Sequence, residues 1–392
     1  MGLVGMTSSR PPVLLVVDSL QCGGAERHVV DLARAIRESR HDVTVACSVA
    51  GDLAGEVEDA GARVAPLMRR LVKRRFSAPY AGALRGLIGA GGFRLVHGHI
   101  HASATAAAAA VAGTGVPLVV TEHTEAPWRR APDRWIGRIA YRRADHVITV
   151  SSAIRRQLLG QFGVPTSKVT YVPNAVTAWA GPAGAVSLPA GCERGPLIGR
   201  VCRLAPEKGL DVFVRAAAAV AARAPSARFL VAGEGPCEAE LRELAAKLGV
   251  DDRVHFLGHR EDARALIARL DMLVVSSITD GAPLVILEAM AAGTPIVASA
   301  CGGIPDQIRH EEDGILVPPA DPGALAAAIL RLVEEPALAV RLGDCGQRRA
   351  SAEFSYEAML ARVQACYVAA ARRRTTRAGP PPLPVAQQVQ AP

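Results

Sequence analysis

Short, continuous apolar runs alternate with longer stretches of helical periodicity along most of the chain, and this alternation occurs twice. The first set of runs covers 13–17, 43–49, 95–97, 118–120, 147–150 and 169–172, and the second covers 197–201, 228–232, 254–257, 272–275, 295–298 and 315–317. Strands that are apolar throughout and separated by helices are typical of parallel sheets covered on both faces. The pattern predicts an α/β protein with two doubly wound, Rossmann-like domains.

The length of the chain supports a division into two domains. A chain of 392 residues is longer than one hydrophobic core usually supports. We predict a disordered start at 1–10, a first domain at 11–185, a second at 186–354, a helix at 355–372 that returns across the boundary, and a disordered proline-rich tail at 373–392. Ligands of such sheets bind beyond the carboxyl ends of the strands. The two sheets are therefore expected to face each other across an interdomain cleft.

Composition and the start of the chain bear on the compartment. The most apolar long stretch, 102–121, is interrupted by Gly113, Gly115 and Pro117, so it predicts a helix and a strand rather than a membrane span. The start, MGLVGMTSSR, lacks the pattern of a signal peptide. The eight cysteines form neither a CxxC pair nor a metal-binding spacing, which favours free thiols. A cytoplasmic protein is expected.

The net charge of +8 comes from the first 180 residues, whereas the remainder is nearly balanced. Five cations lie close together among apolar side chains: Arg69, Arg70, Lys73, Arg74 and Arg75. This segment is either a solvated loop or helix or a site that binds an anionic membrane surface, at the inner face of the membrane. A nucleic-acid partner is disfavoured, because aromatic residues make up only 4% of the chain and form no stacking pattern.

The segment 276–299 carries two carboxylates, Asp280 and Glu288, around the start of a helix. A buried strand ends in a turn at Gly281, and an apolar helix begins near Leu284. Unpaired backbone N–H groups at a helix start bind phosphate, while carboxylates accept hydrogen bonds from hydroxyl groups. The segment therefore predicts a site for a ligand that carries both phosphates and hydroxyls.

Two other segments could bind phosphate. Arg203 follows a predicted strand and Lys208 comes five residues later, so the two cations could neutralise a diphosphate; the alternative is a pair of ordinary surface cations. Gly23 and Gly24 open the helix after the first strand and would let backbone approach a ligand closely; the alternative is a plain tight turn. The sequence lacks a GxGxxG fingerprint there, which argues against a nicotinamide cofactor.

Histidines cluster at two predicted strand ends. His97, His99 and His101 alternate, and His123 follows the next strand. Their period of two could place three rings on one face, but the chain passes from strand to helix within the run, so we predict no metal site. His99 and His123 are expected to point into the cleft and to bond a sugar hydroxyl, unless they are structural histidines with internal partners.

A set of short motifs runs through the chain in a fixed order. The set comprises GGAE at 23–26, His-x-His at 97–99, TEH at 121–123, VPN at 172–174, RLAPEKG at 203–209, GEGP at 233–236, FLG at 256–258, the Asp280/Glu288 pair and GGIPD at 302–306. Over roughly 13–355 this order resembles the retaining GT-B glycosyltransferases of family 4. The resemblance implies the GT-B fold.

The resemblance also implies roles for individual residues. Glu288 would hold the ribose hydroxyls of a nucleotide-sugar donor and Asp280 the hydroxyls of the transferred sugar. Arg203 and Lys208 would bind the diphosphate and stabilise it as it leaves, and His123 would touch the sugar. The other implied donor-binding positions are Gly23, Gly24, Gly233, Gly235, Leu257, Gly281, Leu284 and Val285, while His99 and Asn174 would line the acceptor side of the cleft.

The implied activity is that of a metal-independent, retaining hexosyltransferase. It would need no cofactor beyond the nucleoside-diphosphate sugar, and its acceptor would be a glycan, a lipid-linked molecule or a small molecule, as in cell-envelope polysaccharide or glycolipid synthesis. A sugar-nucleotide epimerase, a phosphorylase or an inactive sugar-nucleotide-binding subunit on the same fold are the alternatives. Three positions depart from the family pattern: Asp280 and Asp306 stand where Glu is usual, and Cys202 where Gly is common.

Overall fold

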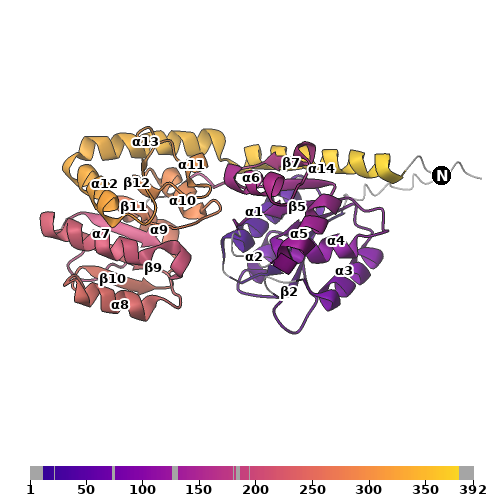
Figure 1. Ribbon diagram of the computed structural model, residues 1–392, viewed down its shortest axis with the longest axis horizontal. Helices are drawn as coiled ribbons and strands as arrows, with labels where there is room; N and C mark the ends of the chain where they lie inside the picture. Colours follow the sequence, from indigo (N-terminus) through magenta and orange to yellow (C-terminus); the bar gives the residue numbers. More distant parts are fainter. Residues whose placement is uncertain are drawn as a thin grey trace, which may run out of the picture.

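The computed structural model describes residues 12–21, 23–72, 76–125, 131–179, 181, 186–193 and 195–378, which form two α/β domains side by side (Figure 1). The predicted disordered start at 1–10 lies outside the described residues, as do Lys73, Arg74 and Arg75 of the basic cluster. Among the helices of the described ranges, none combines the length and the apolar character that crossing a bilayer requires.

The first domain is built on a seven-stranded parallel sheet. Its strands are β1 (Pro12–Ser19), β2 (Asp42–Val49), β3 (Arg63–Pro66), β4 (Leu95–His99), β5 (Leu118–Glu122), β6 (His146–Thr149) and β7 (Val169–Tyr171). They lie in the order β3-β2-β1-β4-β5-β6-β7. The order reverses between β1 and β4, and such a switch point is where doubly wound sheets bind ligands.

Helices cover both faces of this sheet, because alternate side chains of each strand point to opposite sides. Leu14 and Val16 of β1 belong to one core cluster, and Val13 and Leu15 belong to another. The helices are α1 (Gly24–Glu38), α2 (Ala54–Asp59), α3 (Ala78–Gly91), α4 (His101–Ala110), α5 (Ala131–Arg143) and α6 (Ser152–Gly160), with a 3₁₀ turn at Thr166–Lys168. The stretch 102–121 forms most of α4 and the start of β5, as expected.

The second domain repeats the plan with six parallel strands in the order β10-β9-β8-β11-β12-β13. The strands are β8 (Leu197–Val201), β9 (Arg228–Ala232), β10 (Val254–Gly258), β11 (Met272–Val275), β12 (Ile296–Ser299) and β13 (Ile315–Val317). The helices are α7 (Leu210–Arg223), α8 (Glu238–Lys247), α9 (Ala263–Arg269), α10 (Leu284–Ala292), α11 (Ile304–Gln307), α12 (Pro322–Glu334) and α13 (Pro336–Glu353), with a 3₁₀ turn at Pro206–Lys208. Two doubly wound domains confirm the predicted fold class.

The last helix, α14 (Tyr356–Ala378), runs from the end of α13 back over the first domain (Figure 1). It packs against α1, β5 and β6, and its Met359 and Val363 join the core of the first domain. The prediction that disorder begins at 373 is wrong, because the helix continues through 378. Neither Gly nor Pro interrupts the chain there before Gly379, and Arg374 forms an ion pair with Asp145.

Candidate active site

Lys208 and Asp280 meet at the ends of two neighbouring strands of the second sheet. Lys208 lies in the 3₁₀ turn that follows β8, and Asp280 lies in the loop that follows β11, which pairs with β8. The Lys208 Nζ donates to Asp280 Oδ2 at 2.6 Å, and the two side chains are only 22% and 11% exposed. The structure thus brings together two residues that the sequence places 72 positions apart.

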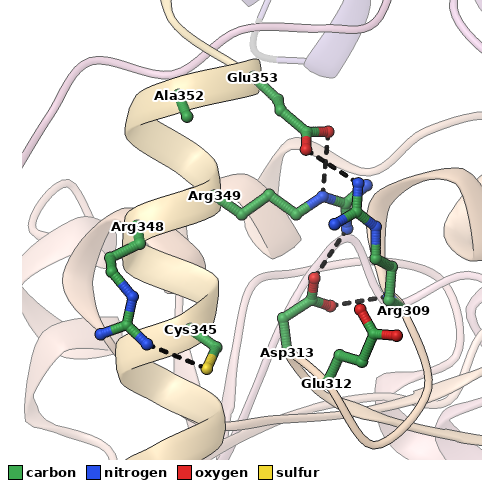
Figure 2. A pocket seen from close by; sticks show the side chains of 8 residues that line it. All are labelled: Arg309, Glu312, Asp313, Cys345, Arg348, Arg349, Ala352 and Glu353. Carbon is green, nitrogen blue, oxygen red and sulfur yellow. Dashed lines mark hydrogen bonds and ion pairs between the residues drawn. The ribbon is translucent and has the colours of Figure 1, made fainter.

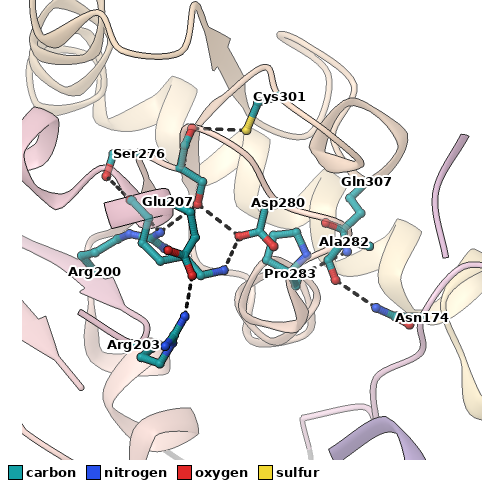
Figure 3. A network of polar contacts seen from close by, with 12 residues as sticks. Asn174, Arg200, Arg203, Glu207, Ser276, Asp280, Ala282, Pro283, Cys301 and Gln307 are labelled. Carbon is teal, nitrogen blue, oxygen red and sulfur yellow. Dashed lines mark hydrogen bonds and ion pairs between the residues drawn. The ribbon is translucent and has the colours of Figure 1, made fainter. Parts of the chain in front are cut away.

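A buried arginine is linked to this pair by hydrogen bonds. Arg200, inside β8, donates to the Ser277 Oγ at 3.0 Å and to the Lys208 carbonyl at 3.3 Å, and Ser277 in turn donates to Asp280 Oδ2 at 3.1 Å. Figure 3 shows Arg200 and Asp280 within this network of polar contacts. Arg200 was not predicted as a site residue, although a single cation within the apolar run LIGRV is a usable signal, since a buried charge requires partners.

Arg203 is oriented differently from Lys208. Its side chain is 55% exposed and its Nη2 donates to Glu207 Oε1 at 2.5 Å (Figure 3). Both cations come from the loop after β8, but only Lys208 is held by Asp280. A ligand diphosphate could therefore recruit Arg203 by displacing one exposed carboxylate, which costs little free energy.

The start of α10 lies next to Asp280 as expected from the sequence. Leu284 and Val285 occupy its first turn, and the N-cap residue is Pro283, which has no side-chain acceptor for their N–H groups. The loop before the helix is held by Gly302, whose φ is +55° and whose added Cβ would lie 1.8 Å from the Asp280 carbonyl oxygen. Backbone N–H groups at this helix start are thus available for an anion close to Lys208.

Glu288, one turn into α10, has a different set of neighbours from Asp280. Burial raises the pKa of its carboxyl group, and Arg264 and Arg27 oppose the shift, while Asp31 adds to it. Arg27 and Asp31 belong to α1 of the first domain. Glu288 therefore lies within electrostatic range of charged residues of the first domain, and the structure gives no direct bond between Glu288 and Asp280.

The Asp280 loop also touches the first domain. A Cβ added to Gly281 would lie 2.1 Å from the His123 carbonyl oxygen, so only glycine permits this approach. Asn174, after β7, donates its amide to the Ala282 carbonyl at 2.9 Å (Figure 3). The loop that carries Asp280 in the second domain and the loop that carries His123 in the first are consequently in direct contact.

A second contact joins the domains beside this point. The Asp306 carboxylate accepts hydrogen bonds from the Ser152 N–H at 2.6 Å and from its hydroxyl at 2.7 Å. Ser152 is the first residue of α6, whose N-cap is Ser151, so a carboxylate of the second domain binds an N–H at the positive end of a first-domain helix. The shorter Asp306 side chain, where the family usually has Glu, reaches this position.

The predicted cleft histidines are buried and neutral. His99 Nδ1 lies 3.1 Å from His123 Nε2. Burial lowers the pKa of the His123 ring to about 4 and that of the His99 ring well below its ordinary value, and the neighbouring rings reinforce the shift at His99. His101 lies elsewhere, 3.3 Å from the Tyr141 hydroxyl, as the break of the alternation predicted. A fourth histidine, His28, was missed; it interrupts the apolar stripe of α1.

Glu125, two residues after His123, is a further carboxyl group that was not predicted as part of the site. Burial raises the pKa of its carboxyl group, Arg156 and Thr279 oppose the shift, and Asp280 contributes to it. A first-domain carboxyl group therefore lies within electrostatic range of Asp280.

The predicted glycine positions lie at strand ends. Gly23 is the N-cap of α1 and Gly24 its first residue; a Cβ at Gly24 would meet no other atom within 4 Å, so the protein itself does not require glycine there. Gly233 and Gly235 follow β9, and Leu257 is partly buried near the end of β10. All five positions lie at or beyond the ends of strands.

A cavity of about 360 Å³ lies away from these residues, beside α13 (Figure 2). Its charged groups neutralise one another: Arg349 pairs with Asp313 at 2.9 Å and with Glu353 at 3.1 Å, and Arg309 pairs with Glu353 at 2.9 Å. Because these charges are paired, the cavity is a poor candidate for binding a phosphorylated ligand.

Comparison with known proteins identifies relatives over most of the chain. The family model described as Glycosyltransferase Family 4 matches residues 22–178, and the model described as Glycosyl transferases group 1 matches residues 195–335. The chain is 31% identical over 382 residues to a D-inositol 3-phosphate glycosyltransferase of Salinispora tropica, which covers 86% of this chain and 78% of the relative. A 2-deoxystreptamine glucosyltransferase of Streptomyces kanamyceticus is 31% identical over 234 residues, which cover 56% of this chain and 58% of the relative.

Solved structures share the fold. HepE of Anabaena in complex with UDP and glucose superposes with a TM-score of 0.81 at 22% identity, over 91% of this chain and 99% of the other. A sucrose-phosphate synthase from Thermosynechococcus elongatus gives 0.78 at 24% identity, over 92% and 98% of the two chains. At these identities the likeness establishes the two-domain architecture and no more.

Proposed function

Because the chain belongs to the group 1 glycosyltransferases of family 4, we propose that it transfers a hexose or a related sugar from a nucleoside-diphosphate sugar with retention of configuration and without a metal ion. The acceptor is a glycan, a lipid-linked molecule or a small molecule, and a role in cell-envelope polysaccharide or glycolipid synthesis fits this activity. The named relatives and HepE support the class of donor, since HepE was solved with UDP and glucose.

One observation carries the proposal: the Asp280 loop and the His123 loop touch across the two domains through Gly281. The contact is made with the main-chain carbonyl of His123, so the loop that carries the carboxylate beside Lys208 adjoins the first-domain residue that carries an imidazole. Lys208 supplies charge for a diphosphate, Asp280 accepts bonds from sugar hydroxyls, and His123 contacts the sugar from the other domain. A phosphorylated sugar is the ligand class that uses all three groups.

The proposed reaction breaks the bond between the anomeric carbon and the diphosphate oxygen. A bond from the acceptor oxygen to that carbon forms on the same face, and the acceptor proton passes to a departing phosphate oxygen. Negative charge grows on the leaving diphosphate, and Lys208, Arg203 and the N–H groups at the start of α10 stabilise it more in the transition state than before. These cations and dipoles take the role that a metal ion plays in other transferases.

Nucleotide release over a panel of nucleotide sugars, with and without membrane extracts, tests the activity. Acceptor-dependent release with an unchanged anomeric configuration in the product, and no loss in chelator, is the expected result. Conversion of the donor without an acceptor would indicate an epimerase, consumption of free phosphate a phosphorylase, and binding without turnover an inactive subunit. Each of these three outcomes would overturn the proposal.

We place the protein in the cytoplasm, with its first domain able to dock on the anionic inner face of the membrane. Arg69 and Arg70 are exposed, and Leu71 and Phe76 are each 39% exposed beside them. Cations next to apolar side chains favour such a surface by about 1 kcal/mol per charge. Co-sedimentation with vesicles that contain anionic lipid, lost in an Arg69→Ser/Arg70→Ser double variant, is expected; a wild-type protein that stays in the supernatant would refute the docking.

A further inference from the structure

Three buried histidines converge at the switch point of the first sheet. His28 comes from α1, His99 from the last position of β4, and His123 from the loop after β5. One ring nitrogen of each lies within 4.8 Å of those of the other two. The ring centroids are 4.9 Å apart for His28 and His123, 5.7 Å for His28 and His99, and 5.4 Å for His99 and His123.

The hydrogen bonds of this cluster are incomplete. His99 is fully buried, and its Nε2 has no hydrogen-bond partner. Its Nδ1 faces His123 Nε2 at 3.1 Å, a contact in which only one of the two nitrogens can donate. Leaving a buried polar atom without a partner costs about 1–3 kcal/mol. The contact between His99 Nδ1 and His123 Nε2 is held by one shared proton, which a metal ion between the two nitrogens would replace.

The neighbouring His97 provides an internal contrast. Its Nδ1 lies 2.9 Å from the Tyr367 hydroxyl and its Nε2 lies 2.7 Å from the Thr121 hydroxyl. Both ring nitrogens of His97 are thus satisfied, although it packs against His99 with centroids 4.1 Å apart. The fold can give a buried histidine two partners at this depth, but it does not do so for His99.

Neutral imidazoles are the preferred protein ligands for zinc and similar transition-metal ions. The three rings are buried and come from three different elements, so they can offer three nitrogen ligands at one place. Magnesium and calcium do not fit, because they take oxygen ligands.

We propose that His28, His99 and His123 form a binding site for Zn²⁺ with three protein ligands. With Zn–N bonds of about 2.0–2.1 Å, two tetrahedral ligand nitrogens lie roughly 3.3 Å apart. The His99–His123 separation of 3.1 Å already matches this value. His28 and His123, at the rim of the cluster with 7% and 8% exposure, supply the remaining approach by small rotations of their rings.

The site has a consequence that rests on the proposed function. His123 is the residue that would contact the donor sugar, and a metal ion on its ring removes that contact. Zn²⁺ is therefore an inhibitor that competes with the nucleotide sugar, and it is not a part of the catalytic machinery. This separates the metal site from the metal-independent transfer proposed above.

Zinc binding is tested directly on the full-length protein by competition with a chromophoric chelator. The wild-type protein is expected to bind one equivalent, and His28→Asn and His123→Asn are expected to weaken the affinity at least about tenfold. His259→Asn changes an exposed histidine of the second domain and serves as the matched control that retains full affinity. Using two ligand variants keeps the test decisive if one of them fails to fold.

Substitution with Co²⁺ identifies the ligands by absorption. Visible bands of a tetrahedral ion without a thiolate-to-metal charge-transfer band support three imidazoles. A thiolate band, an affinity unchanged in both ligand variants, or the absence of zinc binding by the wild-type protein would overturn the inference. None of these measurements uses turnover, so a failure of the zinc site and a failure of the proposed transferase activity are distinguishable.

Discussion

Replacing Lys208 by methionine is expected to reduce both stability and turnover. The Lys208 ammonium lies 2.6 Å from Asp280 Oδ2, and the two side chains are 22% and 11% exposed. Without it, the carboxylate keeps one hydroxyl donor, Ser277, at 3.1 Å. Leaving a largely buried carboxylate without its cation lowers the unfolding free energy by about 1–3 kcal/mol. This loss is smaller than the ~3–5 kcal/mol expected when one partner of a fully buried ion pair is removed.

Arg203→Met is the matched comparison, because both cations are assigned to the diphosphate. Arg203 is 55% exposed and pairs with Glu207 at the surface, and such pairs contribute about 0–1 kcal/mol. Its loss is therefore expected to leave stability nearly unchanged. Both variants are expected to lose about 10²–10³-fold in turnover, the usual effect of removing one group that stabilises a developing negative charge.

Urea unfolding at pH 7 measures the first quantity, and nucleotide release with saturating donor measures the second. Equal stabilities of the Lys208→Met and Arg203→Met proteins would show that the pair with Asp280 contributes no more than a surface ion pair. Wild-type turnover in either variant would remove that residue from the leaving-group site. A loss of stability with full turnover in Lys208→Met would assign the lysine a structural role only.

Three further results are expected. Asp306→Ala should lower the unfolding free energy by about 1–2 kcal/mol in urea, because Ser152 at the start of α6 loses both of its bonds to the second domain; an unchanged value would show that this contact does not stabilise the fold. Glu288→Gln should weaken nucleotide binding in calorimetry by about tenfold or more, and equal affinity would refute its ribose contact. Burial holds the pKa of His97 at about 3 and of His123 at about 4, so below pH 6.5 the unfolded chain binds protons that the folded chain does not; unfolding free energy should fall by about 2 kcal/mol per histidine between pH 7 and 5, and a flat profile would contradict this.

The sheets could be predicted because their strands are apolar throughout. β1 (Pro12–Ser19) is buried along nearly its whole length. A strand of this kind can be recognised from its continuous apolar sequence, even when its neighbouring strands are unknown. β3 (Arg63–Pro66) was missed, because it is a short edge strand whose residues are all at least partly exposed. The end of α14 was predicted too early because the residues after 372 are polar, mainly arginines and threonines, and lack an apolar periodicity. The helix nevertheless continues through them.

The pairing within the site was only partly predictable. Lys208 and Asp280 were expected together, because strand ends of one sheet lie at a common edge. Arg203 was expected to act with Lys208, yet it bonds Glu207. His28 was missed, because a single polar residue on the buried side of a helix has no signature until the sheet brings its partners to it.

The Lys208–Asp280 pair also explains how a site for a charged ligand stays stable before the ligand binds. In the structure the lysine and the carboxylate neutralise each other, and Arg200 and Ser277 hold them in place. In the proposed complex the diphosphate takes over Lys208 while sugar hydroxyls donate to Asp280, so neither charge is left buried without a partner. The aspartate in place of the usual glutamate suits this exchange, since its short side chain stays within reach of the lysine from a loop that Gly302 holds in position. We therefore expect a change at Asp280 to alter which donor sugar the protein prefers.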